Sequence, residues 1–408
     1  MKKVAVLSCI IVMAYNGIAG GYQVNLQGHR ALGMGHCATG LFHGPSSLFF
    51  NPGAFSMLDS SYIQANVHFI FANTVYQEPY PGTYTASTLP GVGTPFSAYF
   101  NFKPKDSKFN FGLGVYTPFG ASIGYEEDWR GSAAIQSMSL ATIFIQPTIA
   151  YQINEKLGIG IGYTYGLGSF ELRKAVPVLD TVGEYGQGIL SGKANGHSFN
   201  VGIYYQASDA LSFGLSYRHN TTVKEEDGTA TFNVPSSLEE HFPSTTFKAQ
   251  LYMPATLSFG AAYQVNEQLQ LAIDYSYVVW SVYDTLAFDF AVYTDKLEDI
   301  ASARMYENTH IFRLGGEYQL NETFSFRAGA YYDMTPVQDG YVTPETPGSN
   351  KIGLTAGVGM NFKNGLSIDA SFLYVEGKER TATNYETNFG GTWKSSGMVP
   401  GIGLTYAL

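Results

Sequence analysis

Residues 20–58 read GGYQVNLQGHRALGMGHCATGLFHGPSSLFFNPGAFSML, and this stretch decides how the rest of the chain must fold. Its many glycines oppose a long helix, and Pro45 and Pro52 oppose a central strand. It is also too apolar and too poor in charge to be a disordered tail. A compact, loop-rich segment of this kind needs walls around it, which we expect the rest of the chain to supply.

The residues before this stretch have the pattern of a removable leader. Two lysines open the chain, an apolar run follows over 4–14, and Gly17 and Ala19 place small residues at the −3 and −1 positions of a cleavage site. The run is shorter than the roughly 20 residues that span a bilayer. We predict a signal peptide at 1–19. Its removal leaves Cys37 as the single cysteine, so we expect no internal disulfide.

The composition after the leader narrows the class of protein. No apolar run approaches the roughly 18 residues of a membrane helix. Aromatic residues make up 15% of the chain and charged residues only 14%, against about 25% charged in a usual soluble protein. A net charge of −10 opposes nucleic-acid binding. The composition favours a transmembrane β-barrel, with a soluble secreted β-sandwich as the alternative.

Segments of alternating polarity fill the chain from residue 61 to its end. Each places apolar side chains at every second position over about ten residues, as strands between lipid and lumen do. We count fourteen such segments in all. Six lie at 61–72, 95–103, 109–118, 140–152, 156–170 and 397–408, and the other eight lie in pairs around turns near 208, 266, 321 and 364.

The connections between these segments alternate in length. The turns, including one near 153, are tight, whereas 120–138, 172–196, 222–250, 283–306 and 377–396 are long. Short turns on one side and long external loops on the other are typical of outer-membrane barrels. We therefore predict an all-β, 14-stranded antiparallel barrel over 61–408, in the outer membrane of a Gram-negative bacterium.

Several motifs carry a resemblance to a known family. They are GYQVNLQG, RALGMGHCATG, SSLFFNPGAFSML, YTPFGASIGYEEDWRG, LYMPATLSFGAAY, DYSYVVWSVYDTL and FRAGAYYDMTPV. In this order they resemble the FadL/TodX family of outer-membrane transporters for long-chain fatty acids and hydrocarbons. The resemblance implies an N-terminal hatch, here 20–60, that plugs the barrel. It also implies that ligands pass from the external loops to a lumenal pocket and leave sideways through the third strand.

The third strand contains the residues that such an opening needs. Pro118, Phe119 and Gly120 lie where the strand should break, since proline cannot donate to the ladder and glycine permits a bulge. An ordinary strand end at Pro118 is the alternative. The resemblance favours a kink that opens the wall.

The resemblance also assigns a role to the hatch motif. Phe49, Phe50, Asn51, Pro52 and Gly53 form its core, and we expect a turn that lies next to the ligand pocket. The family pattern is Asn-Pro-Ala. Gly53 departs from it, and we expect this glycine to loosen the turn.

A fatty-acid carboxylate would need a cation in the lumen. The alternation places Arg313 and Arg327 on inward faces, where they either bind the ligand or belong to salt bridges that fill the barrel. Lys351 matches a basic position of the family, and Arg173 loosely represents another. Glu307 falls near a family lysine, so a neutral hydrocarbon, sterol or lipid substrate also stays open.

Other functions receive weaker support. His29, His36 and His43 lack the carboxylate or thiolate company of a metal site, so we expect neither metal nor cofactor. We expect no enzyme either, because the adjacent His197 and Ser198 point to opposite faces of a strand. The main alternative is a general diffusion porin for small polar solutes, and a structural or adhesive surface protein is another. The expected partners are a hydrophobic small molecule, outer-membrane lipid and the assembly machinery, and we expect a monomer.

Overall fold

The computed structural model describes residues 21–179 and 185–408, so the predicted signal peptide lies outside the described residues. Many barrel strands consist of consecutive pieces. In chain order the strands are β1 (Tyr62–His68) with β2 (Ile70–Gln77); β3 (Thr85–Ser87), β4 (Val92–Gly93) and β5 (Phe96–Phe102); β6 (Phe109–Tyr116) with β7 (Gly120–Gly124); β8 (Ser137–Asn154); β9 (Leu157–Leu179); β10 (Tyr185–Gln206); β11 (Leu211–Arg218) with β12 (Thr221–Asn233); β13 (Thr245–Met253) with β14 (Ala255–Gln264); β15 (Leu269–Val279) with β16 (Thr285–Phe290); β17 (Ile300–Ala303) with β18 (Thr309–Gln319); β19 (Phe324–Asp333); β20 (Lys351–Asn361); β21 (Leu366–Gly377) with β22 (Arg380–Thr383); and β23 (Gly390–Ala407). Two short 3-10 helices, η1 (Ser236–Leu238) and η2 (Trp280–Val282), lie between strands.

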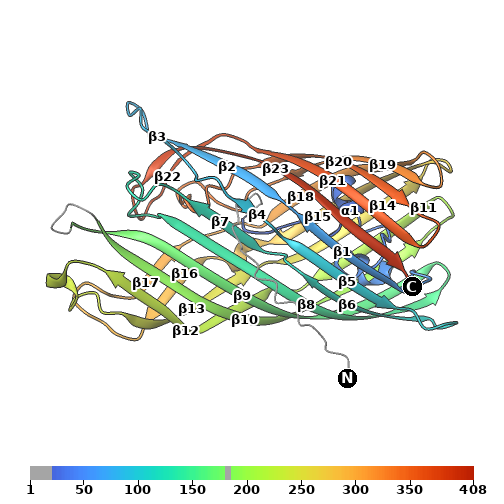
Figure 1. The fold of residues 1–408 in the computed structure, drawn as a ribbon, viewed down its shortest axis with the longest axis horizontal. Coiled ribbons are helices and arrows are strands. Elements are labelled where there is room, and N and C mark those ends of the chain that lie inside the picture. The colour runs from blue at the N-terminus through green and yellow to red at the C-terminus, as the bar shows by residue number, and fades with distance from the viewer. Residues whose placement is uncertain (1–20, 180–184) are drawn as a thin grey trace, which may run out of the picture.

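These strands form one closed antiparallel barrel (Figure 1). β1 pairs with β5 on one side and with the last strand, β23, on the other, which closes the ring. Closure pairs the first strand with the last, so neither terminal strand leaves a free edge to the lipid. The ring has fourteen strands, and the predicted fold class is confirmed.

The outer face of the barrel carries a band of apolar side chains. Large apolar residues from strands all around the ring are 41–55% exposed, among them Phe100, Leu113, Ile161, Leu257, Phe312 and Leu354. A soluble protein would bury such a band, whereas lipid covers it favourably. Among the described residues, none of the helices has both the length and the apolar character to cross a membrane.

Two stretches predicted to be external loops are strands instead. β9 and β10 extend through most of 172–196, and β12 and β13 occupy most of 222–250. Above the bilayer the outer face of a strand contacts water, while inner-face residues such as Leu190 and Phe247 stay buried. The alternation that lipid imposes on the outer face is therefore lost there. The sequence pattern therefore detected only the lipid-facing half of these long hairpins.

The opening stretch of the chain lies inside the ring (Figure 1). Its three short helices are α1 (His29–Gly33), α2 (Ser47–Phe50) and α3 (Pro52–Phe55). α1 contacts β20 and β21, α2 contacts β6, and α3 contacts β9 and β10. Strands from different sides of the barrel thus hold it, and most of its residues are buried.

Candidate functional site

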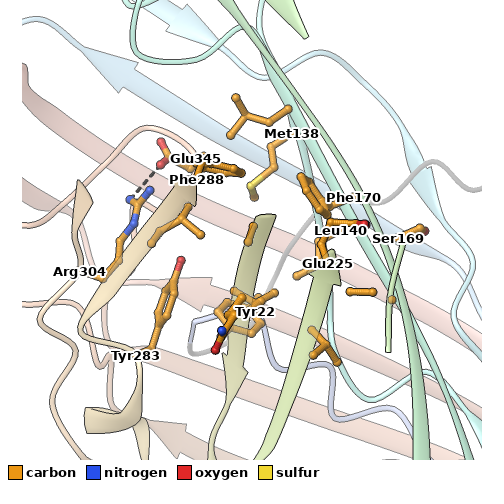
Figure 2. Close-up of a pocket in the computed structure, with 18 of the residues that line it drawn as sticks. Tyr22, Met138, Leu140, Ser169, Phe170, Glu225, Tyr283, Phe288, Arg304 and Glu345 are labelled. Atoms are coloured by element: carbon orange, nitrogen blue, oxygen red, sulfur yellow. Dashed lines mark ion pairs between the residues drawn. The ribbon is translucent and has the colours of Figure 1, made fainter. Parts of the chain in front are cut away.

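An apolar pocket lies among inward-facing side chains of the barrel wall (Figure 2). It holds about 800 Å³ of space not occupied by atoms. Its apolar lining comes from β8, β9, β13 and β16 and includes Met138, Leu140, Phe170, Leu172, Leu251, Leu286 and Phe288. An apolar lining of this kind suits a hydrocarbon or the apolar part of a lipid.

Two charges at one side of this pocket neutralise each other. Arg304, from the connection after β17, pairs with Glu345 at 2.9 Å, and both side chains are at least nine-tenths buried. Figure 2 shows the pair as a dashed line. Sequence reasoning missed both residues, because neither lies in an alternating segment. Their pairing leaves this side of the pocket without net charge.

Tyr22 separates the apolar pocket from the broken third strand. It lines the pocket, and its ring centroid lies 5.0 Å from Trp280, 5.6 Å from Tyr283 and 6.0 Å from Phe119. Its hydroxyl donates to the carbonyl of Tyr252. The start of the hatch therefore contacts the wall through an aromatic side chain.

The third strand is interrupted where the sequence predicts it: β6 ends at Tyr116 and β7 begins at Gly120. The residues between bond to the start of the hatch. The N–H of Val24 donates to the carbonyl of Pro118 at 2.7 Å, and the N–H of Gly120 donates to the carbonyl of Tyr22 at 2.9 Å. The chain thus leaves the wall ladder here and pairs with the hatch.

This interruption leaves a break in the wall ladder. β7 pairs with β8 on one side, but the described residues include no strand pairing between β7 and β3, β4 or β5 on the other. Two single hydrogen bonds bound the break. Thr117 donates its N–H to the carbonyl of Phe96 at 3.3 Å, and Leu89 donates to that of Gly124 at 2.7 Å. We call this break the wall gap.

A second cavity, with about 720 Å³ of open space, lies between the hatch and the wall gap. We call it the inner cavity. It brings together five residues that the sequence singled out, namely Phe49, Phe50, Pro118, Phe119 and Arg313. Arg313 donates to the hydroxyl of Ser276 at 2.8 Å. The expectation that Arg313 faces the lumen therefore agrees with its position.

Arg218 is a further cation of the inner cavity that sequence reasoning missed. Its guanidinium lies 4.3 Å from the centre of the Phe49 ring and donates to the Phe49 carbonyl at 2.7 Å. It also donates to the hydroxyl of Tyr116 at 3.0 Å. Arg218 lies at the end of β11, where the inward alternation of that strand would have placed it. It joins the hatch to the last residue of β6.

The Asn-Pro-Gly turn packs against the wall rather than lining either cavity. The amide of Asn51 donates to the carbonyls of Thr39 and Ile203, at 2.8 and 3.0 Å, and its oxygen accepts from the N–H of Gly53 at 2.9 Å. A Cβ atom on Gly53 would lie only 2.6–2.7 Å from backbone atoms of Ile203. The glycine therefore permits a close contact, and the looser turn that we expected does not occur.

The facing wall is also made of glycine. Gly158 and Gly160 of β9 and Gly202 of β10 point at the hatch, and a Cβ atom on any of them would lie 2.0–2.3 Å from a hatch atom. Such a close approach of two backbones requires glycine. The inward glycines of these strands thus form the seat of the hatch.

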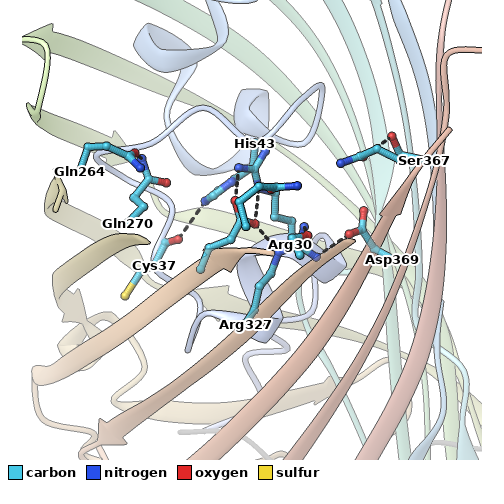
Figure 3. Close-up of polar contacts among 12 residues, drawn as sticks. Arg30, Cys37, His43, Gln264, Gln270, Arg327, Ser367 and Asp369 are labelled. Carbon is cyan, nitrogen blue, oxygen red and sulfur yellow. Dashed lines mark hydrogen bonds and ion pairs between the residues drawn. The ribbon is translucent and has the colours of Figure 1, made fainter. Parts of the chain in front are cut away.

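A buried ion cluster anchors the other side of the hatch (Figure 3). Arg30 of α1 pairs with Glu317 at 2.6 Å, and Arg327 pairs with both Glu317 and Asp369. The Arg327 side chain is 4% exposed. Of the two roles that we considered for Arg327, a salt bridge that fills the barrel therefore fits better than ligand binding, because its guanidinium already binds two carboxylates.

The other two predicted cations lie apart from both cavities. Lys351 is the register partner of Asp333 across β19 and β20, is buried, and lines a further cavity with Gly21 and Ser122. Arg173 pairs with Glu171 at 2.8 Å and is 42% exposed. Because Leu172 lines the apolar pocket, Arg173 points to the outer face. The structure thus contradicts its assignment as a lumenal cation.

The hatch histidines are not gathered into one site. His29 stacks on His68 of β1 at 4.1 Å between ring centroids, and His43 contacts the carbonyl of the buried Cys37. No group of three or more His, Cys, Asp or Glu side chains within 21–179 and 185–408 is placed to hold a metal ion.

The adjacent histidine and serine of β10 are also separate. His197 contacts the hydroxyl of Tyr163, whereas Ser198 donates to a backbone carbonyl, that of His219, at 2.8 Å. Neither contact places the serine hydroxyl against the histidine ring, so these two residues do not form a nucleophile and its base.

Comparison with known proteins agrees with this architecture. The family model described as "Outer membrane protein transport protein (OMPP1/FadL/TodX)" matches residues 10–408. Outer membrane protein P1 of Haemophilus influenzae is 24% identical over 323 residues, which cover 72% of this chain and 68% of that protein. The long-chain fatty acid transport protein of Salmonella typhi is 23% identical over 308 residues, covering 67% and 68%.

Solved structures show the same fold. A FadL homologue of Pseudomonas aeruginosa superposes with a TM-score of 0.82 at 19% identity, covering 95% of this chain and 99% of that one. The toluene transporter TodX of P. putida superposes with a TM-score of 0.75 at 17% identity, covering 97% and 99%. The chain therefore belongs to the OMPP1/FadL/TodX family of outer-membrane transport proteins.

Proposed function

We propose that this protein carries hydrophobic molecules through the outer membrane and releases them sideways through the wall gap. The observation that carries the proposal is the juxtaposition of the apolar pocket, Tyr22 and the wall gap. Each methylene kept out of water is worth about 0.8 kcal/mol. A long apolar molecule therefore favours a path from an apolar pocket into lipid over a water-filled pore. The names of relatives, a long-chain fatty acid transport protein and a toluene transporter, support this substrate class.

The proposed route begins at the apolar pocket. A ligand that fills it contacts Tyr22, the residue whose backbone holds Gly120. Displacement of Tyr22 and Val24 would free Pro118 and Gly120 from the hatch and connect the inner cavity with the wall gap. The ligand would then leave between β7 and the barrel strand made of β3, β4 and β5, directly into lipid.

The rest of the hatch stays in place in this proposal. Asn51 and Gly53 seat it on β10, and Arg30 ties it to Glu317 on the other side. In this proposal the part that moves is the start of the hatch, where Tyr22 and Val24 bond to the kink. Residues 20–60 thus act as a permanent plug, of which only the start moves. A general porin would need an open lumen, so the plug argues against that alternative.

The charges of the two cavities bear on the substrate. In the apolar pocket the guanidinium of Arg304 is already paired with Glu345, so a carboxylate there would compete with a buried ion pair. Arg218 and Arg313 of the inner cavity have hydrogen bonds to neutral groups. Because the cation at the apolar pocket is already paired, we propose that the ligand group held in this pocket is not a carboxylate.

The test is an uptake assay in cells that lack their own hydrophobe transporters. Cells that produce the protein should take up a labelled alkane or monoaromatic faster than cells with the empty vector. Labelled small sugars should enter both at the same rate. Sugar uptake without hydrophobe uptake would establish the porin alternative instead.

A further inference from the structure

Glu225 is a charged residue that neither the hatch nor the proposed route uses. It lies on β12 and lines the apolar pocket, on the side away from the Arg304–Glu345 pair (Figure 2). The residue is 6% exposed. Burial of a carboxylate in apolar surroundings is costly unless partners satisfy both oxygens. The contacts of each Glu225 oxygen therefore decide whether the carboxylate is satisfied.

Only one of the two oxygens is satisfied. Oε1 accepts from the N–H of Asp227 at 2.9 Å. Oε2 is buried and has no hydrogen-bond partner among the described residues. The nearest acidic neighbour along the strand, Glu226, points away and pairs with Lys248 at 3.5 Å. One lone acceptor thus remains in the wall between the apolar pocket, which holds no other unpaired charge among its described lining residues, and a more open pocket lined by Gly192, Lys193 and Lys224.

The local backbone is shaped around this carboxylate. The register of β12 shifts against both β10 and β13 next to Glu225, which marks a β-bulge. The bulge turns the N–H of Asp227 onto Oε1. Across the ladder, a Cβ atom on Gly192 would lie 2.3 Å from Oε2, so glycine leaves the space that this oxygen occupies. The carboxylate is held in one orientation, with Oε2 spare.

We infer that the apolar pocket binds molecules whose polar end donates a hydrogen bond, a primary ammonium or a hydroxyl group, to Oε2 of Glu225. The inference rests on the proposed function, since it specifies the polar end of the ligand that this pocket takes. A donor would satisfy the lone acceptor, and an ammonium would also balance its charge. A carboxylate end would meet a like charge at this position.

The experiment compares four twelve-carbon probes, dodecylammonium, dodecanol, dodecane and dodecanoate. Their binding to the purified full-length protein in amphipol is measured by titration calorimetry. In Glu225→Gln the amide oxygen can still accept from Asp227, but the charge is gone. Since hydrogen bonds to charged groups are the stronger ones, dodecylammonium should bind about tenfold more weakly to this variant and dodecanol several-fold more weakly. Dodecane should bind both proteins equally, and dodecanoate should bind the variant at least as well.

Two further variants separate this role from a structural one. Glu226→Gln removes a neighbouring exposed charge and should change none of the four affinities. Gly192→Ala crowds Oε2 without removing charge and should weaken dodecylammonium binding while dodecane binding persists. Dodecane binding to the wild type with unchanged dodecylammonium affinity in Glu225→Gln would refute this inference alone. Failure of dodecane to bind the wild type would refute the proposed function as well.

Discussion

A disulfide between the start of the hatch and the broken strand should close the proposed path. Gln23 and Phe119 form an isolated antiparallel bridge, and such partners have Cα atoms roughly 4.5–5.5 Å apart. Disulfides span about 4.4–6.8 Å between Cα atoms. Gln23→Cys with Phe119→Cys should therefore cross-link without moving the backbone. The natural Cys37 is buried and should not compete.

The structure gives the size of the barrier that the cross-link replaces. Two backbone hydrogen bonds join Tyr22 and Val24 to the kink, and each contributes about 1 kcal/mol. The aromatic contacts of Tyr22 and its hydroxyl bond to Tyr252 add about 1 kcal/mol each. A closed state favoured by about 4 kcal/mol is open roughly 0.1% of the time. A covalent bond removes this open fraction completely, so uptake should fall to background rather than by a modest factor.

The assay measures uptake of a labelled alkane by intact cells before and after treatment with a reductant. The oxidised double variant should transport at the rate of cells with the empty vector, and reduction should restore uptake. Each single-cysteine variant should transport under both conditions, which controls for the lost phenylalanine. Uptake by the oxidised double variant at the rate of its reduced form would refute the reasoning, because the hatch and kink would then not need to separate.

Three further predictions follow from the packing. Gly53→Ala should lower the thermal stability of the barrel by about 1–3 kcal/mol, as overpacking does, because its Cβ atom would meet the backbone of β10; a melting curve would measure it. Arg327→Met should destabilise the folded protein by about 3–5 kcal/mol in a denaturant titration, since it leaves the buried Glu317 and Asp369 without this partner. Phe170→Ala should weaken alkane binding by about fivefold in calorimetry, because it removes about 1 kcal/mol of apolar contact in the pocket.

The barrel itself is readable from the sequence because lipid imposes a strict alternation. Each lipid-facing residue, such as Phe100 or Leu354, is followed by one that faces the lumen, and this pattern identified all fourteen strands. The break at Pro118 and Gly120 was also readable, since proline and glycine act through the backbone alone. The long hairpins above the membrane were missed, because no lipid enforces alternation there.

The chemistry of the lumen was harder to predict. Arg313 lies on the inward face that alternation predicts because it is in a regular strand, and its contact with a ligand stays a prediction. Arg304 and Glu345 meet only through the folding of two irregular connections. Arg173 was misplaced because its segment was treated as a loop, where alternation assigns no face. The role of Gly53 was misjudged because glycine is needed there for the close approach of the Ile203 backbone, which is far away in the sequence. Local sequence patterns do not predict contacts between segments that are distant in the chain.

The most direct test of the central claim is to restore the wall. Residues 116–122 would be rebuilt as a regular strand without proline or glycine, so that the third strand can pair along its whole length. Alkane binding in calorimetry would confirm that the variant folds and keeps the apolar pocket. We predict that this variant binds alkane like the wild type but takes up none above background in cells. Uptake at the wild-type rate would contradict lateral release through the wall gap.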